Sequence, residues 1–363
     1  MFNRIPAPLF QDAAIKRRTM KEAVALLIND IHVNKDNISD FNQNWDEMLS
    51  VCKRENIADI VIGGDMFTSR ASQTLATLLA VKHALDKTVA QGIYVTIAEG
   101  NHDKIDQESF EGYNHLWIGR KHIEVIDVCK VLMWEDCDFA LLVMSYFPED
   151  GSFLERMWHA VQDTLKQYPN ISKSDIILYI HQGIHGALGE FEIPGELPQE
   201  PLLGFKAVLC GHYHNRVKIK NTNIEYIGSS RQGNFGEDEE KGYTILYSDG
   251  SYGFVKNEVN TRYKTIELNA DKTDNFQLDK DERYKYKVKV KCNEKQAKLF
   301  DKQKLLDLGF YKVEVVTEST VSKESAASGI QEKYDKQGIK KEYLNYCNEN
   351  SIDSKLGIKY LEG

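Results

Sequence analysis

The sequence is poor in the patterns that mark disulfide-rich, collagen-like or membrane-spanning chains. Its 363 residues include only 7 Pro and 6 Cys, and no two cysteines have the C-x-x-C spacing of redox or zinc motifs. No run approaches the ~18 consecutive apolar residues that a membrane helix requires. Hydrophobic residues make up 42% of the chain, which is enough for a buried core. We therefore expect a globular intracellular protein with reduced thiols and no membrane segment.

Residues 1–22 show no clear periodicity, and we interpret them as an extension outside the main fold. Lys16-Arg17-Arg18 and the apolar residues that follow imitate the start of a secretory signal. The apolar run 23–28 is shorter than the ~7–15 residues of such a signal, and it leads to Asp30 and His32 rather than to a cleavage site. We therefore interpret this run as the start of the fold.

Short apolar runs bounded by turn residues recur through the next 190 residues or so. They are 23–29, 58–62, 93–98, 139–146, 175–180 and 207–210. Near-continuous Val, Ile and Leu is typical of strands buried on both faces. Apolar residues at three- and four-residue spacing predict a helix at 71–91 that ends at Gly92. Alternation of strands and helices predicts an α/β fold with a parallel or mixed sheet. Further strands are expected at 223–227 and 242–248.

A second region, expected at 261–319, has a different pattern. Residues 284–292 alternate with a period of two, which predicts a strand with one apolar face. The other face carries four lysines, Lys285, Lys287, Lys289 and Lys291. A helix at 295–308 and a strand at 311–316 would complete a small β-α-β unit. Residues 320–363 would form a tail with a last helix near 339–348.

Residues of metal-ligand type follow the ends of five apolar runs. They are Asp30 and His32, then Asp65, then Asn101, then His181, and finally His212 and His214. Because the carboxyl ends of parallel strands meet at one edge of a sheet, we expect these side chains to converge. Carboxylate, imidazole and amide donors without cysteine suit borderline or hard divalent ions. The sequence therefore predicts a metal centre at this edge.

These motifs, D-x-H, G-G-D, G-N-H-D, a lone His and G-H-x-H, resemble the five signatures of the calcineurin-like metallophosphoesterases over residues 23–215. The segment 226–242, Y-I-G-S-S-R-Q-G-N-F-G-E with E-K-G shortly after it, resembles the end of the catalytic domain in SbcD-type DNA nucleases and related phage recombination subunits. The resemblance implies a metallophosphoesterase β-sandwich flanked by helices at 23–260. It also implies a small α+β cap domain at 261–319 and a partner-docking helical tail at 320–363.

The resemblance also implies a role for each candidate ligand. One ion would lie on Asp30, His32 and His214, a second on Asn101, His181 and His212, and Asp65 would bridge them. Likeness to the family favours Mn²⁺ as both ions.

His102 would serve the leaving oxygen as a proton donor in this resemblance. In relatives an Asp or His three residues after the bridging carboxylate orients this histidine. This chain has Thr68 there, whose hydroxyl can hydrogen-bond the imidazole but carries no charge to stabilise its protonated form. Asp103 and Arg70 are candidates for supporting or phosphate contacts, with solvated loop charges as the alternative.

The charge of the chain is acidic overall but unevenly distributed. The net charge is −9, which is unusual for a protein that binds DNA by itself, but residues 283–312 carry ten Lys and Arg against three Asp and Glu. The lysine face would guide DNA; the alternative is a solvated strand face. The resemblance implies a homodimer through the exposed face of 71–91, within a heterotetramer containing an SbcC-like coiled-coil ABC ATPase that docks on the tail. It also implies a cytoplasmic location in a bacterial or phage-infected cell.

The sequence therefore favours a Mn²⁺-dependent DNA exonuclease and endonuclease subunit that acts on double-stranded DNA ends in repair, recombination or replication. A stand-alone phosphatase or small-molecule phosphodiesterase is the first alternative. A non-catalytic scaffold is the second, and the complete set of ligand-type residues disfavours it.

Overall fold

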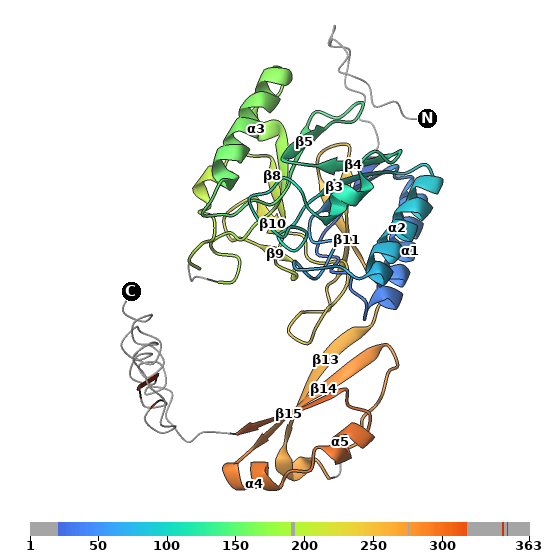
Figure 1. Ribbon diagram of the computed structural model, residues 1–363, viewed down its shortest axis with the longest axis vertical. Helices are drawn as coiled ribbons and strands as arrows, with labels where there is room; N and C mark the ends of the chain where they lie inside the picture. The colour runs from blue at the N-terminus through green and yellow to red at the C-terminus, as the bar shows by residue number, and fades with distance from the viewer. Residues whose placement is uncertain (1–20, 190–192, 275, 318–342, 345–346, 348–363) are drawn as a thin grey trace. The chain divides into compact units, whose positions relative to one another are not determined.

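The computed structural model describes residues 21–189, 193–274, 276–317, 343–344 and 347. The chain divides into two units (Figure 1). The first contains the described residues up to Lys264 together with Lys280–Lys285, and the second contains Thr265–Asp279 and the described residues from Tyr286 onward. Nearly all of the expected extension at 1–22 and of the tail at 320–363, with its last helix, lies outside the described residues.

The first unit contains two six-stranded sheets. One sheet has the strand order β12-β11-β1-β2-β3-β4. Its parallel strands are β1 (Ala23–Ile28), β2 (Asp59–Gly63), β3 (Tyr94–Ala98) and β4 (Ile123–Ile126). The strand β11 (Gly242–Tyr247) pairs antiparallel with β1 and with β12 (Tyr252–Lys256).

The other sheet of this unit has the strand order β5-β6-β7-β8-β10-β9. Its parallel strands are β6 (Ala140–Met144), β7 (Ile176–His181), β8 (Ala207–Gly211) and β10 (Ile224–Tyr226). Two antiparallel edge strands, β5 (Cys129–Leu132) and β9 (Val217–Lys218), close it. The sequence did not predict β4, β5, β9 or β12, because these strands lack a long apolar run.

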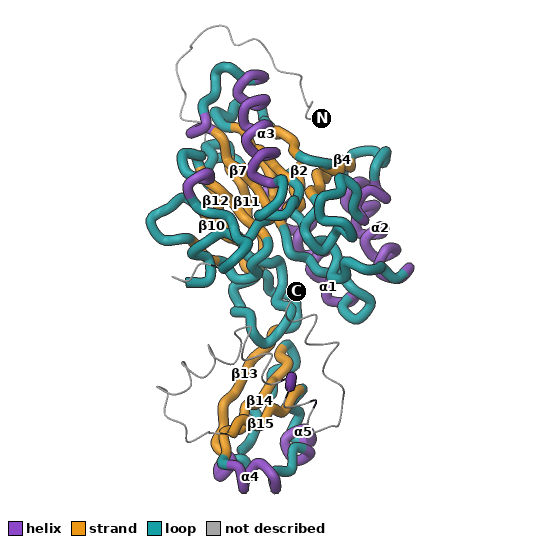
Figure 2. The backbone as a smooth tube through the Cα atoms, turned by 60° about the vertical axis from the view of Figure 1, so that its left-hand side comes forward, coloured by secondary structure: helices purple, strands orange, loops and turns teal. Residues whose placement is uncertain are grey.

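Helices cover the outer faces of the two sheets (Figures 1 and 2). The helices α1 (Ile38–Glu55) and α2 (Leu75–Ala90) pack on the first sheet, and α3 (Phe153–Gln167) packs on the second. Short 3₁₀ turns are η1 (Tyr113–Trp117), η2 (Lys173–Asp175) and η3 (Glu200–Leu202). The helix predicted from residue 71 begins four residues later, because Thr74 caps it by accepting a hydrogen bond from the backbone N–H of Thr77.

Alternate side chains along each strand pack on opposite faces of its sheet and so form the layers of this unit. Leu26 and Ile28 of β1 pack under α1 and α2, whereas Ala25 and Leu27 pack between the two sheets. Each fully buried aliphatic side chain contributes roughly 1.5–3 kcal/mol to stability. The prediction of an α/β fold is therefore confirmed, and its strands are buried on both faces as the apolar runs indicate.

The second unit centres on a three-stranded sheet with the order β13-β14-β15. The strands are β13 (Arg262–Asn269), β14 (Tyr284–Cys292) and β15 (Lys312–Thr317), with β14 and β15 parallel. The strand predicted at 284–292 is confirmed. The helix predicted at 295–308 is instead two short helices, α4 (Glu294–Leu299) and α5 (Gln303–Asp307), because the backbone of Phe300 between them is extended (ψ 118°). A 3₁₀ turn, η4 (Ala270–Lys272), follows β13.

Two expectations about the whole chain are tested by the described residues. All six cysteines are among them, and each is a free thiol. None of the described helices is both long enough and apolar enough to cross a membrane.

Candidate metal centre

Loops at the carboxyl ends of five strands bring the predicted ligands together. Asp30 and His32 follow β1, Asp65 follows β2, and Asn101 follows β3. His181 is the last residue of β7, and His212 and His214 lie in the loop after β8. The first three loops come from one sheet and the last two from the other, so the centre lies where the ends of both sheets meet.

Four of these residues have backbone dihedrals that L-amino acids rarely adopt. The φ angles are 51° at Asp30, 49° at His32, 53° at Asp65 and 93° at His212. Such conformations cost of order 1–3 kcal/mol each and persist only where surrounding contacts enforce them. Two backbone hydrogen bonds join the loops after β1 and β2: Asp30 N–H donates to the Gly64 carbonyl (3.1 Å) and His32 N–H donates to the Asp65 carbonyl (3.0 Å).

The loop after β3 needs a glycine next to the central carboxylate. A Cβ atom on Gly100 would collide with the side chain and backbone nitrogen of Asp65. The glycine before Asn101 therefore allows close approach of the two loops, which explains the G-N-H-D motif in steric terms.

Asp30, His32 and His214 form the first group of ligand atoms. The Nε2 atoms of the two imidazoles lie 3.0 Å apart and 3.9–4.0 Å from Asp30 Oδ1. His32 Nδ1 lies 3.2 Å from the Phe67 carbonyl and His214 Nδ1 lies 2.9 Å from a carboxylate oxygen of Glu237, so both Nδ1 atoms are the donors. Both Nε2 atoms then present lone pairs to each other, an arrangement that a cation between them stabilises.

The second group comprises Asp30, Asp65 and His181, with Asn101 and His212 beside it. His181 Nε2 lies 3.2 Å from Asp65 Oδ2, 3.8 Å from Asp30 Oδ1 and 3.2 Å from Asn101 Oδ1. His181 Nδ1 lies 3.1 Å from the Gly63 carbonyl, which leaves Nε2 as the acceptor. His212 joins through Nδ1, which lies 3.4 Å from Asn101 Oδ1.

Asp65 lies between the two groups. Its Oδ2 is 3.2 Å from His181 Nε2 and 3.5 Å from His32 Nε2, and it is buried. Asp30 is also close to both groups, whereas the sequence assigned it to the first alone.

The buried carboxylates attract positive charge strongly. Although burial opposes the charged form, Asp65 and Asp30 raise the pKa of His181 to about 9. Against its own burial, the pKa of Asp65 is lowered by His181 and His32. Both shifts show that a positive charge beside these carboxylates is favoured.

The amide of Asn101 has two orientations with different partners. With Oδ1 toward His181 and His212, it offers an oxygen to the same point as Asp65, as a metal ligand must. With the amide turned over, its nitrogen donates to Asp65 and His181 and its oxygen accepts from Arg70. The turned amide satisfies more hydrogen bonds without a cation, and the first orientation suits a bound cation.

The donor set fits two divalent cations. Imidazole nitrogens, carboxylate oxygens and one amide oxygen converge with lone pairs facing each other, and the opposite edges of three rings are already committed to hydrogen bonds. Mixed nitrogen and oxygen donors of this kind suit Mn²⁺, Fe²⁺ or Zn²⁺ better than soft ions.

His102 lies beside the first group and is held in a way that the sequence did not predict. Its ring packs edge-on against His32, with centroids 5.0 Å apart, and its backbone N–H donates to Asp65 Oδ1 (2.8 Å). Its Nδ1 donates to the backbone carbonyl of Thr68 (2.6 Å). The Thr68 hydroxyl, expected to orient this ring, instead donates to the His32 carbonyl (2.7 Å). Any residue type at position 68 has this carbonyl.

Asp103 is fully buried rather than exposed to a substrate. Its carboxylate accepts hydrogen bonds from the backbone N–H groups of Met66, Phe67 and Gly100, at 2.8–3.2 Å. Burial, Glu99 and Asp65 raise the pKa of Asp103, while the N–H groups of Gly100 and Phe67 favour its ionised form. The side chain thus ties the loop after β2 to the loop after β3. Arg70, in contrast, is exposed and lies next to Asn101.

The four predicted DNA-binding lysines share one face of β14. The other face, with Tyr286, Val288 and Val290, is buried. Two of the lysines have acidic partners: Lys287 pairs with Glu314 of β15, and Lys291 pairs with Glu267 of β13 (2.7 Å). Lys285 Nζ lies over the ring of Tyr263, 5.3 Å from its centroid. The positive charge of this face is therefore smaller than the sequence indicates.

Two residues that contact the centre were missed at the level of sequence. Glu237 accepts from His214, and Arg231 donates to the carbonyls of Ile31 and His32 (2.8 and 3.1 Å). Both belong to the segment 226–242 that was singled out only for its resemblance. Glu237 could have been identified from the sequence as a carboxylate in the segment that resembles the end of the catalytic domain, which follows the G-H-x-H motif.

A sequence model of the calcineurin-like phosphoesterases matches residues 24–216, which contain all the candidate ligands. The chain belongs to the calcineurin-like phosphoesterase family. Enzymes of this family are hydrolases of phosphoester bonds and bind divalent metal ions. The predictions of a hydrolase and of a metal centre are confirmed at this level, and the mixed α/β fold with two sheets agrees with the family.

Individual relatives are distant. The protein of Invertebrate iridescent virus 6 named phosphoesterase 244L is 25% identical over 301 residues, 79% of this chain and 100% of the viral protein. The SbcD component of the SbcCD nuclease of Staphylococcus saprophyticus is 26% identical over 223 residues, 55% of this chain and 58% of that component. Among solved structures, the nuclease MPE of Pseudomonas putida covers 62% of this phosphoesterase and 84% of its own chain at 14% identity, with a TM-score of 0.28.

Proposed function

We propose that this phosphoesterase is a Mn²⁺-dependent DNA exonuclease and endonuclease subunit of the SbcD type, acting on double-stranded DNA ends with an SbcC-like ATPase. The observation that carries the proposal is the convergence of seven ligand-type side chains from two sheets into two adjoining groups. The similarity to a component of the SbcCD nuclease supports DNA as the substrate. Cleavage in repair, recombination or replication is the corresponding role.

In this proposal Asp30, His32 and His214 would hold one ion, and Asn101, His181 and His212 would hold the other. Asp65 would serve both ions, since its Oδ2 lies within 3.5 Å of an imidazole from each group. When bound, two divalent ions supply an activated water and stabilise the charge on the attacking and leaving oxygens of a phosphodiester.

The protein's own groups hold the substrate and move protons. His102 Nδ1 is committed to the Thr68 carbonyl, so its Nε2 is the atom that exchanges a proton with the leaving oxygen. Arg70, exposed beside Asn101, is the candidate contact for a non-bridging phosphate oxygen. Asp103 acts indirectly by holding the two loops in register.

The cap at 261–319 would contact the DNA backbone through β14. Lys285, Lys287, Lys289 and Lys291 are the proposed contacts, although Glu314 and Glu267 already pair with two of them. The tail at 320–363 would dock the ATPase, whose own surface then supplies DNA affinity that this acidic chain lacks. A location in the cytoplasm belongs to the same proposal.

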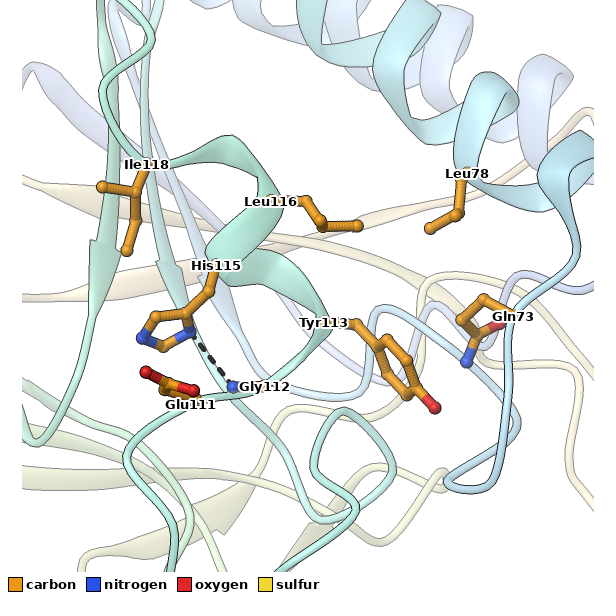
Figure 3. Close-up of a pocket in the computed structure, with 8 residues that line it drawn as sticks. All are labelled: Gln73, Leu78, Glu111, Gly112, Tyr113, His115, Leu116 and Ile118. Carbon is orange, nitrogen blue, oxygen red and sulfur yellow. Dashed lines mark hydrogen bonds between the residues drawn. The ribbon is translucent and has the colours of Figure 1, made fainter.

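A groove beside α2 supports the proposed homodimer. It has a volume of about 740 Å³ and lies between α2 and η1 (Figure 3). The side chains of Leu78, Tyr113 and Leu116 face this space, and Leu75 and Leu79 on α2 are exposed nearby. An apolar surface of this kind suits a second copy of the chain. Light scattering of Leu79→Glu against the wild-type protein tests it, with a monomer expected for the variant.

The test of the proposed function is cleavage of end-labelled duplex DNA by the purified protein. Activity is expected with Mn²⁺, and it should vanish with EDTA and in His212→Ala. Mg²⁺ is the comparison ion. Bis-p-nitrophenyl phosphate serves as a generic phosphodiester in parallel.

A stand-alone phosphatase or small-molecule phosphodiesterase is the second candidate, favoured by the full-length match to the viral phosphoesterase. It predicts turnover of nucleotides or small phosphoesters in preference to duplex DNA. Robust turnover of these with no DNA cleavage, also after addition of an SbcC-like ATPase, would contradict the nuclease.

A further inference from the structure

The segment Gly228–Lys241, which lies beyond the residues matched by the family, encloses His214. The His214 carbonyl accepts hydrogen bonds from the Ser229 N–H (2.9 Å) and from Lys241 Nζ (2.6 Å). Its imidazole Nδ1 meets Glu237 Oε1 at 2.9 Å. One segment therefore fixes both the backbone and the ring of this candidate ligand.

The carboxylate of Glu237 is held in place by its own loop. Its Oε2 accepts from the Gly233 N–H (3.0 Å) and its Oε1 accepts from Asn234 Nδ2 (2.6 Å). Lys241 Nζ lies 3.6 Å from Oε2, and only 8% of the Glu237 side chain is exposed. These contacts thus fix the orientation of the Glu237 carboxylate toward His214.

His214 differs in this respect from the other two imidazoles that present Nε2. The Nδ1 partners of His32 and His181 are the neutral carbonyls of Phe67 and Gly63. Among the described residues of the centre, the hydrogen bond from Nδ1 to a carboxylate is found at His214. A carboxylate partner makes an imidazole a stronger electron-pair donor and fixes the tautomer that leaves Nε2 unprotonated.

We propose that Glu237 is a positioning residue that sets the affinity of one of the two metal ions, the one held by Asp30, His32 and His214. The proposal rests on the proposed function, because it requires that this group binds a metal. Glu237 belongs to a segment outside the five signature motifs, so that segment would make one group of ligands bind its ion differently from the other. Loss of a carboxylate of this kind lowers metal affinity by about 10- to 100-fold.

Calorimetric titration of Mn²⁺ into the full, EDTA-treated chain tests the proposal without reference to activity. The wild-type protein should bind two ions. Glu237→Ala should bind one of them at least tenfold more weakly and leave the other unchanged. Glu237→Gln keeps the hydrogen-bond acceptor without the charge, so its loss should be smaller.

Glu240→Gln is the matched control, because Glu240 belongs to the same segment but is exposed and pairs with Lys256 (2.6 Å). It should titrate like the wild type. If Glu237→Ala unfolds, Glu237→Gln is isosteric and still reports on one ion. Thermal melting of each metal-free variant measures the structural cost separately.

The results separate the two proposals. A wild-type chain that binds no Mn²⁺ contradicts the proposed function itself. A wild-type chain that binds two ions, with Glu237→Ala and Glu237→Gln unchanged, overturns the role of Glu237 alone. Equal weakening of both ions, with a lowered melting temperature of the metal-free variants, also overturns it, since Glu237 would then hold the fold rather than one ligand.

Discussion

The histidine-rich centre of the first unit and the lysine face of β14 carry their charges in opposite ways. At the centre, the candidate ligands lie at the ends of five strands, and four of these residues have positive φ. Three of the imidazole rings have a second hydrogen-bond partner. On β14, one strand supplies all four lysines in ordinary extended backbone, and neighbouring strands contribute compensating carboxylates. The centre is strained and prearranged, whereas the lysine face is unstrained and partly neutralised. We therefore expect changes at the centre to have far larger effects.

The largest effect is expected from Asp65→Asn. This change removes the negative charge from the carboxylate that lies nearest to both groups of ligands, so neither ion should bind tightly. The loss of cleavage should exceed the ~10- to 100-fold loss that is typical when a residue that only hydrogen-bonds to a metal ligand is replaced. Mn²⁺ titration and cleavage assays measure it together. Retention of two tightly bound ions would remove Asp65 from its bridging position.

A smaller effect on metal binding but a large effect on rate is expected from His102→Ala. The ring lies beside the ligands without belonging to either group, so both ions should still bind. Loss of a proton donor lowers the rate by about 10²- to 10⁴-fold. Single-turnover cleavage with Mn²⁺ in excess measures the chemical step. An unchanged rate would assign the proton transfer to another group.

The lysine face should respond through salt dependence rather than through chemistry. The double change Lys287→Glu and Lys289→Glu should weaken duplex binding, and the log–log salt slope should fall by roughly 0.9 for each phosphate that the protein no longer neutralises. Glu314→Gln should act in the opposite direction, because it releases Lys287 from its partner. Binding titrations at several salt concentrations give both slopes. If neither variant changes the slope, the face is a solvated surface.

The smallest effect is expected from Thr68→Ala. The backbone carbonyl that holds His102 is retained. The variant loses the hydroxyl, which donates to the His32 carbonyl and accepts from Asn34 Nδ2. Stability should fall by about 1–3 kcal/mol, as for the removal of two hydrogen bonds. Cleavage should stay close to the wild-type level. A large fall in rate with normal metal binding would show that the hydroxyl, contrary to the geometry, supports the proton donor.

Much of the fold could be predicted because its strands are buried on both faces. Run 207–210 is apolar throughout and run 58–62 is apolar except for Asp59, and each lies within a residue of the observed strand. The edge strands β5 and β9 were missed, since an edge is short and half exposed and leaves no continuous apolar run. The single helix expected at 295–308 was wrong, because the backbone leaves the helical conformation at Phe300 despite the helical periodicity of the sequence.

The candidate site could be predicted as a set of residues but not as a set of contacts. The order of motifs named all seven ligand-type side chains, because strand ends in an α/β sheet converge whatever the loops contain. The partner of His102 was different from the expected one, since a backbone carbonyl carries no sequence signal. The burial of Asp103 was not predicted for a similar reason: its partners are backbone N–H groups, two of which belong to a loop 36 to 37 residues away.

The sequence by itself determined which residues could bind metal, because ligand chemistry resides in the side chains and strand ends fix their common edge. Only the tertiary structure decided how those side chains are held. Glu237 reaches His214 across 23 positions, and Glu314 neutralises Lys287 across 27, through contacts that no local pattern encodes. Charge and donor type are local properties of a chain, whereas the electrostatic environment of a group depends on everything that the fold packs around it.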